Sequence, residues 1–119
     1  MLVDSDIPIS TVIVGCHVTR YDKLVRDRIP TIIEANGEDP TTHVADDAEY
    51  PRRLREKLNE EVAEFHESAD PQELADILEV VYALADHAGF SPDELERLRS
   101  EKADERGGFE DGIVLERVE

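Results

Sequence analysis

The stretch "NEEVAEFHESADPQELADILE", Asn59 to Glu79, predicts two helices joined by a short turn, and this pair decides the fold. Asp70 is suited to cap the second helix, Pro71 to its first position, and Glu73 to completing a capping box. Because only a few residues separate the two helices, they should pack as antiparallel neighbours.

Apolar residues at helical spacing extend both helices beyond the quoted stretch. The first should run from Asp46 or Asp47 to about Ser68, and the second from Pro71 to His87 or Ala88. In the first helix the acid Glu61 falls within the apolar stripe Leu54, Leu58, Val62 and Phe65. In the second helix a wide apolar arc indicates burial on more than one side: Leu74, Ile77, Leu78, Val81, Leu84, Ala85 and Ala88.

Two further helices flank this pair. A short one is expected from about Arg28 to Ala35, with Asp27 as its cap. Another begins after Ser91, whose capping box is closed by Glu94, and ends near Arg106 before two glycines. Residues 41–45 and 112–118 are candidates for short extended segments that pair with each other. Residues 1–20, rich in β-branched side chains, predict an N-terminal extension, either a strand or a loosely packed arm.

Length and composition indicate one all-α domain over residues 21–119. The 119 residues suffice for a single modest core, and with 5% aromatics and no Trp that core must be built from aliphatic side chains. We therefore expect an antiparallel helical bundle with short peripheral extended segments. Its broad apolar arcs should be covered by oligomerisation, as a homodimer or tetramer.

The charge balance excludes one class of partner. A formal net charge of −17 repels polymeric nucleic acid. The lone cysteine, Cys16, gives no disulfide, and the apolar segment "IPISTVIVGCHV" is too short to span a membrane. We expect a cytoplasmic protein that associates with no membrane.

Two pairs of acids stand out near the predicted turn. Glu61 and Glu64 are spaced as helix-surface neighbours, as are Glu73 and Asp76 on the next helix. If the pairs face each other, they could bind a hard divalent cation such as Mg²⁺ or Mn²⁺. The spacing leaves another interpretation open, in which Glu64 and Asp76 are solvated, Glu73 only caps its helix and Glu61 bends outward.

The segments "EEVAEF" and "ELADILEVVYALA" resemble the E-x-x-E and E-x-x-D helices of the MazG-like, all-α nucleoside triphosphate pyrophosphohydrolase superfamily. "YDKLVRDRIPTIIEANGE" and "KADERGGFEDGIVL" fit one branch of it, which is phosphoribosyl-ATP pyrophosphohydrolase-like. The resemblance runs from about Tyr21 to Leu115, and residues 1–20 precede the usual start of this branch. It implies that the Mg²⁺ ligands, with Mn²⁺ as a substitute, are Glu61, Glu64, Glu73 and Asp76. It also implies triphosphate contacts for Lys23, Arg26, Lys57, Lys102 and Arg106.

The implied reaction is attack of water on the α-phosphorus of a nucleoside triphosphate, which gives the monophosphate and pyrophosphate. Glu61 or its neighbour Glu60 would orient or deprotonate that water. The role would be the clearance of noncanonical nucleotides. One alternative is the phosphoribosyl-ATP pyrophosphatase of histidine biosynthesis, and another is a noncatalytic helical dimerisation module. Arg28, Arg52, Arg53 and Arg97 are assigned to surface ion pairs, and the same assignment is the alternative for Lys57.

Overall fold

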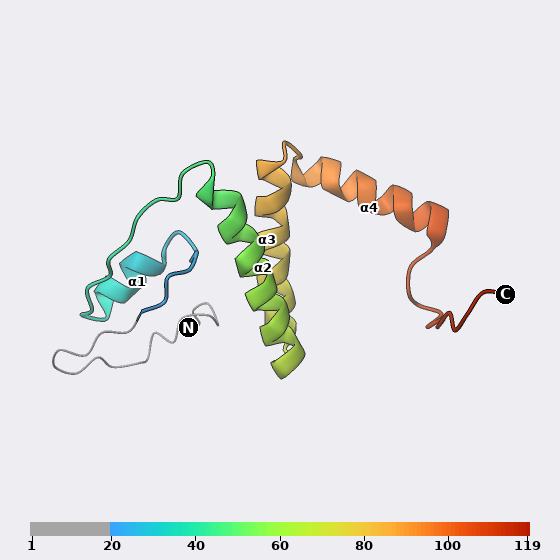
Figure 1. Ribbon diagram of the computed structural model, residues 1–119, viewed down its shortest axis with the longest axis horizontal. Helices are drawn as coiled ribbons and strands as arrows, with labels where there is room; N and C mark the ends of the chain where they lie inside the picture. The colour runs from blue at the N-terminus through green and yellow to red at the C-terminus, as the bar shows by residue number, and fades with distance from the viewer. Residues whose placement is uncertain (1–19) are drawn as a thin grey trace.

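The computed structural model describes residues 20–119, which form four helices and, within that range, no strand (Figure 1). The helices are α1 (Ile29–Ala35), α2 (Glu49–Ser68), α3 (Pro71–His87) and α4 (Pro92–Arg106). The prediction of an all-α protein is confirmed. Residues 1–19, on which the expected strand or arm and Cys16 fall, lie outside the described residues. None of the helices in residues 20–119 combines the length and apolarity needed to cross a membrane.

The helix ends follow the local signals in the sequence. The side chain of Asp70 accepts a hydrogen bond from the backbone N–H of Gln72 at 3.0 Å. Ser91 and Glu94 form the full capping box expected for α4. Asp46 lies before α2 and accepts from the backbone N–H of Glu49 at 2.8 Å. These bonds satisfy amide groups that have no partner within the helix, so local sequence marks where α2, α3 and α4 begin.

Two predicted caps do not form as expected. The residue that caps α1 is Arg28 rather than Asp27, and the Arg28 side chain makes no capping hydrogen bond. At α3, Asp70 binds the amide of Gln72 rather than that of Glu73. Glu73 is buried instead.

The predicted pairing of segments 41–45 and 112–118 is wrong, because both are irregular. α4 carries the C-terminal segment to the opposite side of the molecule from the segment that precedes α2 (Figure 1). Val44 and Ile113 are accordingly 94% and 85% exposed. Without a neighbouring strand, an alternating sequence has no partner for its backbone groups.

The centre of the molecule is the contact between α2 and α3, which pack along each other. Tyr50 near the start of α2 contacts His87 at the end of α3, with ring centroids 5.6 Å apart, so the two helices are antiparallel. Among the described residues, the buried apolar side chains are those of Ile29, Leu54 and Val80, and the buried charged ones are those of Lys57, Glu61 and Glu73. Half of this small interior is therefore charged, which is unusual for a region that serves only packing.

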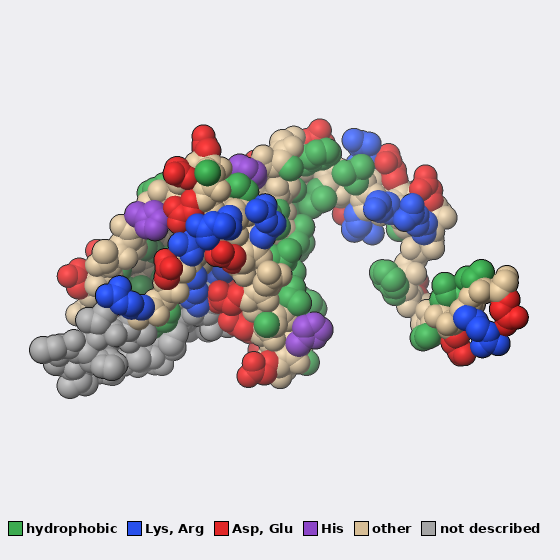
Figure 2. Space-filling view, viewed as in Figure 1, with side chains coloured by type: hydrophobic (Ala, Val, Ile, Leu, Met, Phe, Trp, Pro, Cys, Tyr) green, Lys and Arg blue, Asp and Glu red, His purple; other side chains and the backbone are tan. Residues whose placement is uncertain are grey.

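The outer side of α3 is apolar and exposed. Leu74, Leu78 and Tyr82 recur every four residues, and their exposed fractions are 49%, 48% and 39%. Figure 2 shows hydrophobic side chains gathered along the edge of the helix pair that faces α4. The wide apolar arc expected in this helix is thus only partly covered by residues 20–119.

Candidate functional site between α2 and α3

Three carboxylates from two helices converge on one point. An oxygen from each of Glu61, Glu64 and Glu73 lies within 4.8 Å of the other two. We call these three residues the acidic cluster. Two unit charges at this separation repel by about 3 kcal/mol or more at an effective dielectric of 20, before screening by solvent. An arrangement that brings them together needs compensating positive charge.

Glu61 is the most enclosed member of the acidic cluster, with 1% of its surface exposed. Burial raises its pKa from the ordinary value of 4.5 to about 7, and the negative charges of Glu64 and Asp76 act in the same direction. The ammonium group of Lys57, 3.3 Å from Oε2 of Glu61, opposes this rise in pKa. Glu61 therefore exchanges a proton near neutral pH. Its side chain is buried among the apolar residues of α2 and does not bend outward to solvent.

Lys57 and Lys23 bring positive charge beside the acidic cluster. Lys57 is buried on α2, one turn before Glu61. Its Nζ also lies 3.9 Å from Oε2 of Glu60, and the same oxygen lies 2.9 Å from Nζ of Lys23. Glu60, predicted as an alternative to Glu61 for positioning water, thus lies beside both lysines.

Arg26 reaches the site from the segment that precedes α1. Its Nη2 donates to Oδ1 of Asp76 at 2.7 Å. Asp76 is the fourth predicted metal ligand; it lies close enough to Glu61 to affect its pKa. Arg26 and Lys23 both belong to residues 20–28, which we call the 20–28 segment.

Arg53 holds the 20–28 segment against α2. Its guanidinium donates to the backbone oxygen of Asp22 at 2.8 Å and to the carboxylate of Asp22 at 3.0 Å. The same side chain donates to Glu49, and this bond lowers the pKa of Glu49. The ion pairs predicted for Arg52, Arg53 and Arg97 are confirmed, but Arg53 also anchors a segment that carries two site residues.

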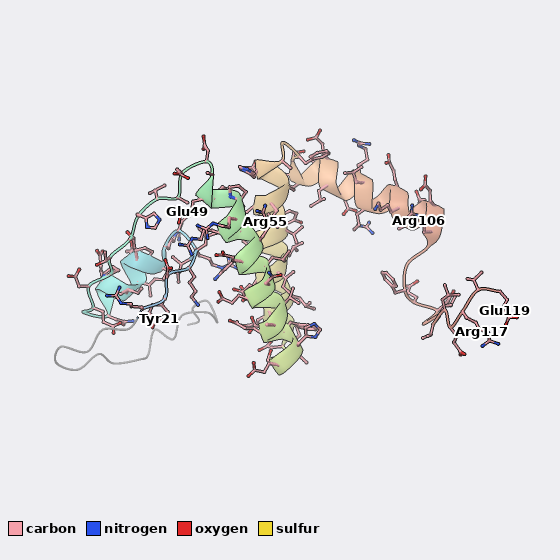
Figure 3. All side chains as sticks on the ribbon, viewed as in Figure 1. Tyr21, Glu49, Arg55, Arg106, Arg117 and Glu119 are labelled. Atoms are coloured by element: carbon pink, nitrogen blue, oxygen red, sulfur yellow. The ribbon has the colours of Figure 1, made fainter. Side chains whose placement is uncertain are left out.

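The structure does not bring Lys102 and Arg106 to the acidic cluster. Both lie on the last two turns of α4. α4 leaves the end of α3 and runs away from the helix pair, and Arg106 lies at its far end (Figure 3). Any contact between these two residues and a ligand of the acidic cluster requires a different placement of α4 or a second copy of the chain.

A cavity of about 390 Å³ adjoins the acidic cluster between the 20–28 segment, α2 and α3. Its polar wall includes Arg26, Lys57, Glu61 and Asp76. The sequence alone does not mark the residues of its apolar wall as part of a site. They are Leu24, Val25, Tyr50, Leu54, Val80 and Ala83. The signal for some of them was present, because Tyr50, Leu54, Lys57 and Glu61 lie on one face of α2.

The acidic cluster fits a hard divalent cation by the chemistry of its donors. Its members supply only carboxylate oxygens, which Mg²⁺ and Mn²⁺ prefer, and they come from two helices that fix their spacing. Asp76, on α3, lies close enough to the acidic cluster for its charge to raise the pKa of Glu61.

Comparisons with known proteins leave the family of the chain undecided. No family model matches it, and no solved structure matches it. A protein of Mycolicibacterium smegmatis described as uncharacterized is 47% identical over 53 residues, which are 44% of this chain and 53% of that protein. The match thus spans about half of the relative's length. Its description names no activity, so the functional argument depends on the site itself.

Proposed function

We propose that the protein is a Mg²⁺-dependent nucleoside triphosphate pyrophosphohydrolase of the MazG-like type, with Mn²⁺ as a substitute ion. The observation that carries the proposal is the convergence of Glu61, Glu64 and Glu73 from two antiparallel helices. The cations of Lys57, Lys23 and Arg26 beside it and the adjoining cavity support the proposal. The resemblance of the acidic helices and of the 20–28 segment to that superfamily supports it as well.

In this proposal Glu61, Glu64, Glu73 and Asp76 hold the cation. When bound, Mg²⁺ supplies neutralisation of phosphoryl charge and a lower pKa for coordinated water. The water oxygen forms a bond to the α-phosphorus while the bond from that phosphorus to the bridging oxygen breaks, which releases pyrophosphate. Glu61 or Glu60 orients this water and accepts its proton.

The basic residues bind the phosphate chain. Arg26 lines the cavity from the 20–28 segment and Lys57 lines it from α2, and Lys23 is paired with Glu60, the neighbour of Glu61. In a chain with a formal net charge of −17, placed cations are needed to hold a polyphosphate. Lys102 and Arg106 enter this role only if α4 of another copy reaches the site.

We also propose that the bundle is completed by self-association as a homodimer or tetramer. The exposed row Leu74, Leu78 and Tyr82 supports this, since so few apolar side chains of residues 20–119 are buried within one copy. The projection of α4 away from its own helix pair supports it too. A cytoplasmic location and a role in clearing noncanonical nucleotides complete the proposal.

The test is a screen of common and modified nucleoside triphosphates and phosphoribosyl-ATP, with pyrophosphate detection in Mg²⁺, in Mn²⁺ and in a chelator. Release of pyrophosphate and monophosphate that requires the metal is expected. Glu61→Gln should abolish turnover while the circular dichroism spectrum is unchanged, because a charge is lost and the volume is kept. Glu67→Gln, an exposed acid on the same helix, is the matched control. Native rates in Glu61→Gln would rule out the ligand assignment, and no release from any substrate would favour a noncatalytic module.

A further inference from the structure

The cavity beside the acidic cluster has an end that the proposed reaction does not use. At one end are the cations and carboxylates described above. Toward the Tyr50 end of the helix pair the lining is apolar, from Tyr50, Leu54, Val80 and Ala83, and Leu24 and Val25 of the 20–28 segment add apolar lining. Such a change from charged to apolar lining within one cavity is typical of a site whose ligand is itself charged at one end and apolar at the other.

Along α2, the residues that line the cavity change from apolar to charged. Tyr50, Leu54, Lys57 and Glu61 are separated by four, three and four positions, so they lie on one face of the helix. At a rise of about 1.5 Å per residue, Glu61 lies about 16 Å beyond Tyr50 along the axis. An aromatic ring, an aliphatic side chain, a cation and a carboxylate thus follow one another.

The antiparallel helix repeats this order. Ala83 and Val80 of α3 line the apolar end, and Asp76 lines the charged end. The contact between Tyr50 and His87 fixes which ends of the two helices meet. The lining therefore changes from apolar to charged in the same direction along α2 and along α3. This change does not depend on any one side chain.

We propose that the apolar end of the cavity is a subsite for the base of the nucleotide, with Tyr50 as the aromatic residue against which the base packs. This inference rests on the proposed function and adds to it the position of the nucleoside. The charged end holds the phosphates, so the base extends toward Tyr50, where Leu54, Val80 and Ala83 supply an apolar lining. The edge-to-face contact with His87, at an interplanar angle of 74°, orients the Tyr50 ring. Asp27, Arg28 and Glu79 complete the lining and offer hydrogen-bonding groups to the edge of the base.

The test compares a triphosphate that carries a base with one that does not. The KM of the nucleoside triphosphate that the unmodified protein hydrolyses fastest is measured with Mg²⁺, together with the inhibition constant of inorganic tripolyphosphate. Tyr50→Ala should raise the KM by about 5- to 150-fold, the range for loss of one base–aromatic contact. The inhibition constant of tripolyphosphate should change less than about twofold, because that ligand makes no base contact. Tyr50→Phe should behave as the unmodified protein does.

Two further variants control the experiment. Phe109→Ala removes an aromatic ring that is 98% exposed and absent from the lining of the cavity, and it should leave both constants unchanged. Ala83→Leu narrows the apolar end and keeps Tyr50, so it should reproduce the selective rise in KM even if Tyr50→Ala does not fold.

The outcomes separate this subsite from the proposed function. Hydrolysis by the unmodified protein, with Tyr50→Ala and Ala83→Leu affecting both ligands equally or neither, would overturn the subsite alone. Absence of hydrolysis with every triphosphate would overturn the proposed function and the subsite together.

Discussion

Nη2 of Arg26 lies 2.7 Å from Oδ1 of Asp76, although fifty positions separate the two residues in the chain. This ion pair brings a basic residue of the 20–28 segment to an acid of α3 that we propose as a metal ligand. Arg26 is 43% exposed and Asp76 17%, so solvent screens the pair and its contribution to stability is small. The pair matters for binding, because the positive charge of Arg26 would repel a metal ion bound at Asp76 and attract a phosphate group.

Replacing Arg26 with Ala should affect the two ligands in opposite directions. The dissociation constant of Mn²⁺, followed by electron paramagnetic resonance, should fall by about two- to tenfold because a nearby positive charge is lost. The KM of the triphosphate should rise by about tenfold or more, since a charge-assisted contact is worth about 1.5–3 kcal/mol. Arg97→Ala, which removes a surface ion pair on α4, is the control and should change neither constant. Weaker Mn²⁺ binding in Arg26→Ala would contradict the expected sign.

Glu61 should make stability depend on pH in an unusual direction for an acid. Its pKa is about 7 in the folded protein and 4.5 ordinarily, so folding favours the protonated form. This contribution to the free energy of unfolding is fully present below about pH 4.5 and is lost as the pH rises through about 7. Urea unfolding between pH 5 and 8, in a chelator, should show Glu61→Gln gaining stability relative to the unmodified protein as the pH increases. A difference that is constant with pH would show that Glu61 is ionised throughout.

Proton release provides a second measure of the same carboxylate. If Glu61 binds the metal in its ionised form, Mn²⁺ binding near pH 6 should expel most of a proton, and binding at pH 8.5 should expel almost none. Calorimetric titrations in two buffers of different ionisation enthalpy report this number directly. Glu61→Gln should show no such release from this position. Equal release at both pH values in the unmodified protein would count against a titrating ligand.

Arg53 should determine how firmly the 20–28 segment is held. Arg53→Lys keeps the positive charge but loses the planar group that donates to Asp22 and Glu49 together. The free energy of unfolding should fall, and amide hydrogen exchange in residues 20–28 should accelerate. Arg52→Lys, on an exposed neighbour, should change stability by less than about 0.5 kcal/mol. Unchanged exchange in Arg53→Lys would assign the anchoring to other contacts.

The apolar row on α3 should control the oligomeric state. Leu78→Glu places a charge in the middle of the row Leu74, Leu78 and Tyr82, and it should shift the protein toward monomer in light scattering coupled to size-exclusion chromatography. Val44→Glu, at a position that is 94% exposed outside the helices, should leave the mass unchanged. A monomeric unmodified protein would remove the basis for self-association and would leave this row to another partner.

Much of the fold and part of the site could be predicted from local sequence. The positions of all four helices in residues 20–119 follow from caps, glycine stops and apolar periodicity, as at Asp70 and Ser91. The position of Glu61 within an apolar stripe indicated an inward-facing acid, and the structure buries this residue. The apolar wall of the cavity was missed, because Tyr50 and Val80 resemble ordinary core residues until the 20–28 segment is placed beside them.

The helices follow from local sequence, because the hydrogen bonds of a helix and its caps join residues no more than four positions apart. Which distant residues meet depends on the folded arrangement of the chain. That arrangement placed Arg26 against Asp76, directed Lys102 and Arg106 away from the acidic cluster, and kept the segment after Gly112 from pairing as a strand. These outcomes depend on the path of the chain between helices, since contacts across dozens of residues arise from loop geometry and packing.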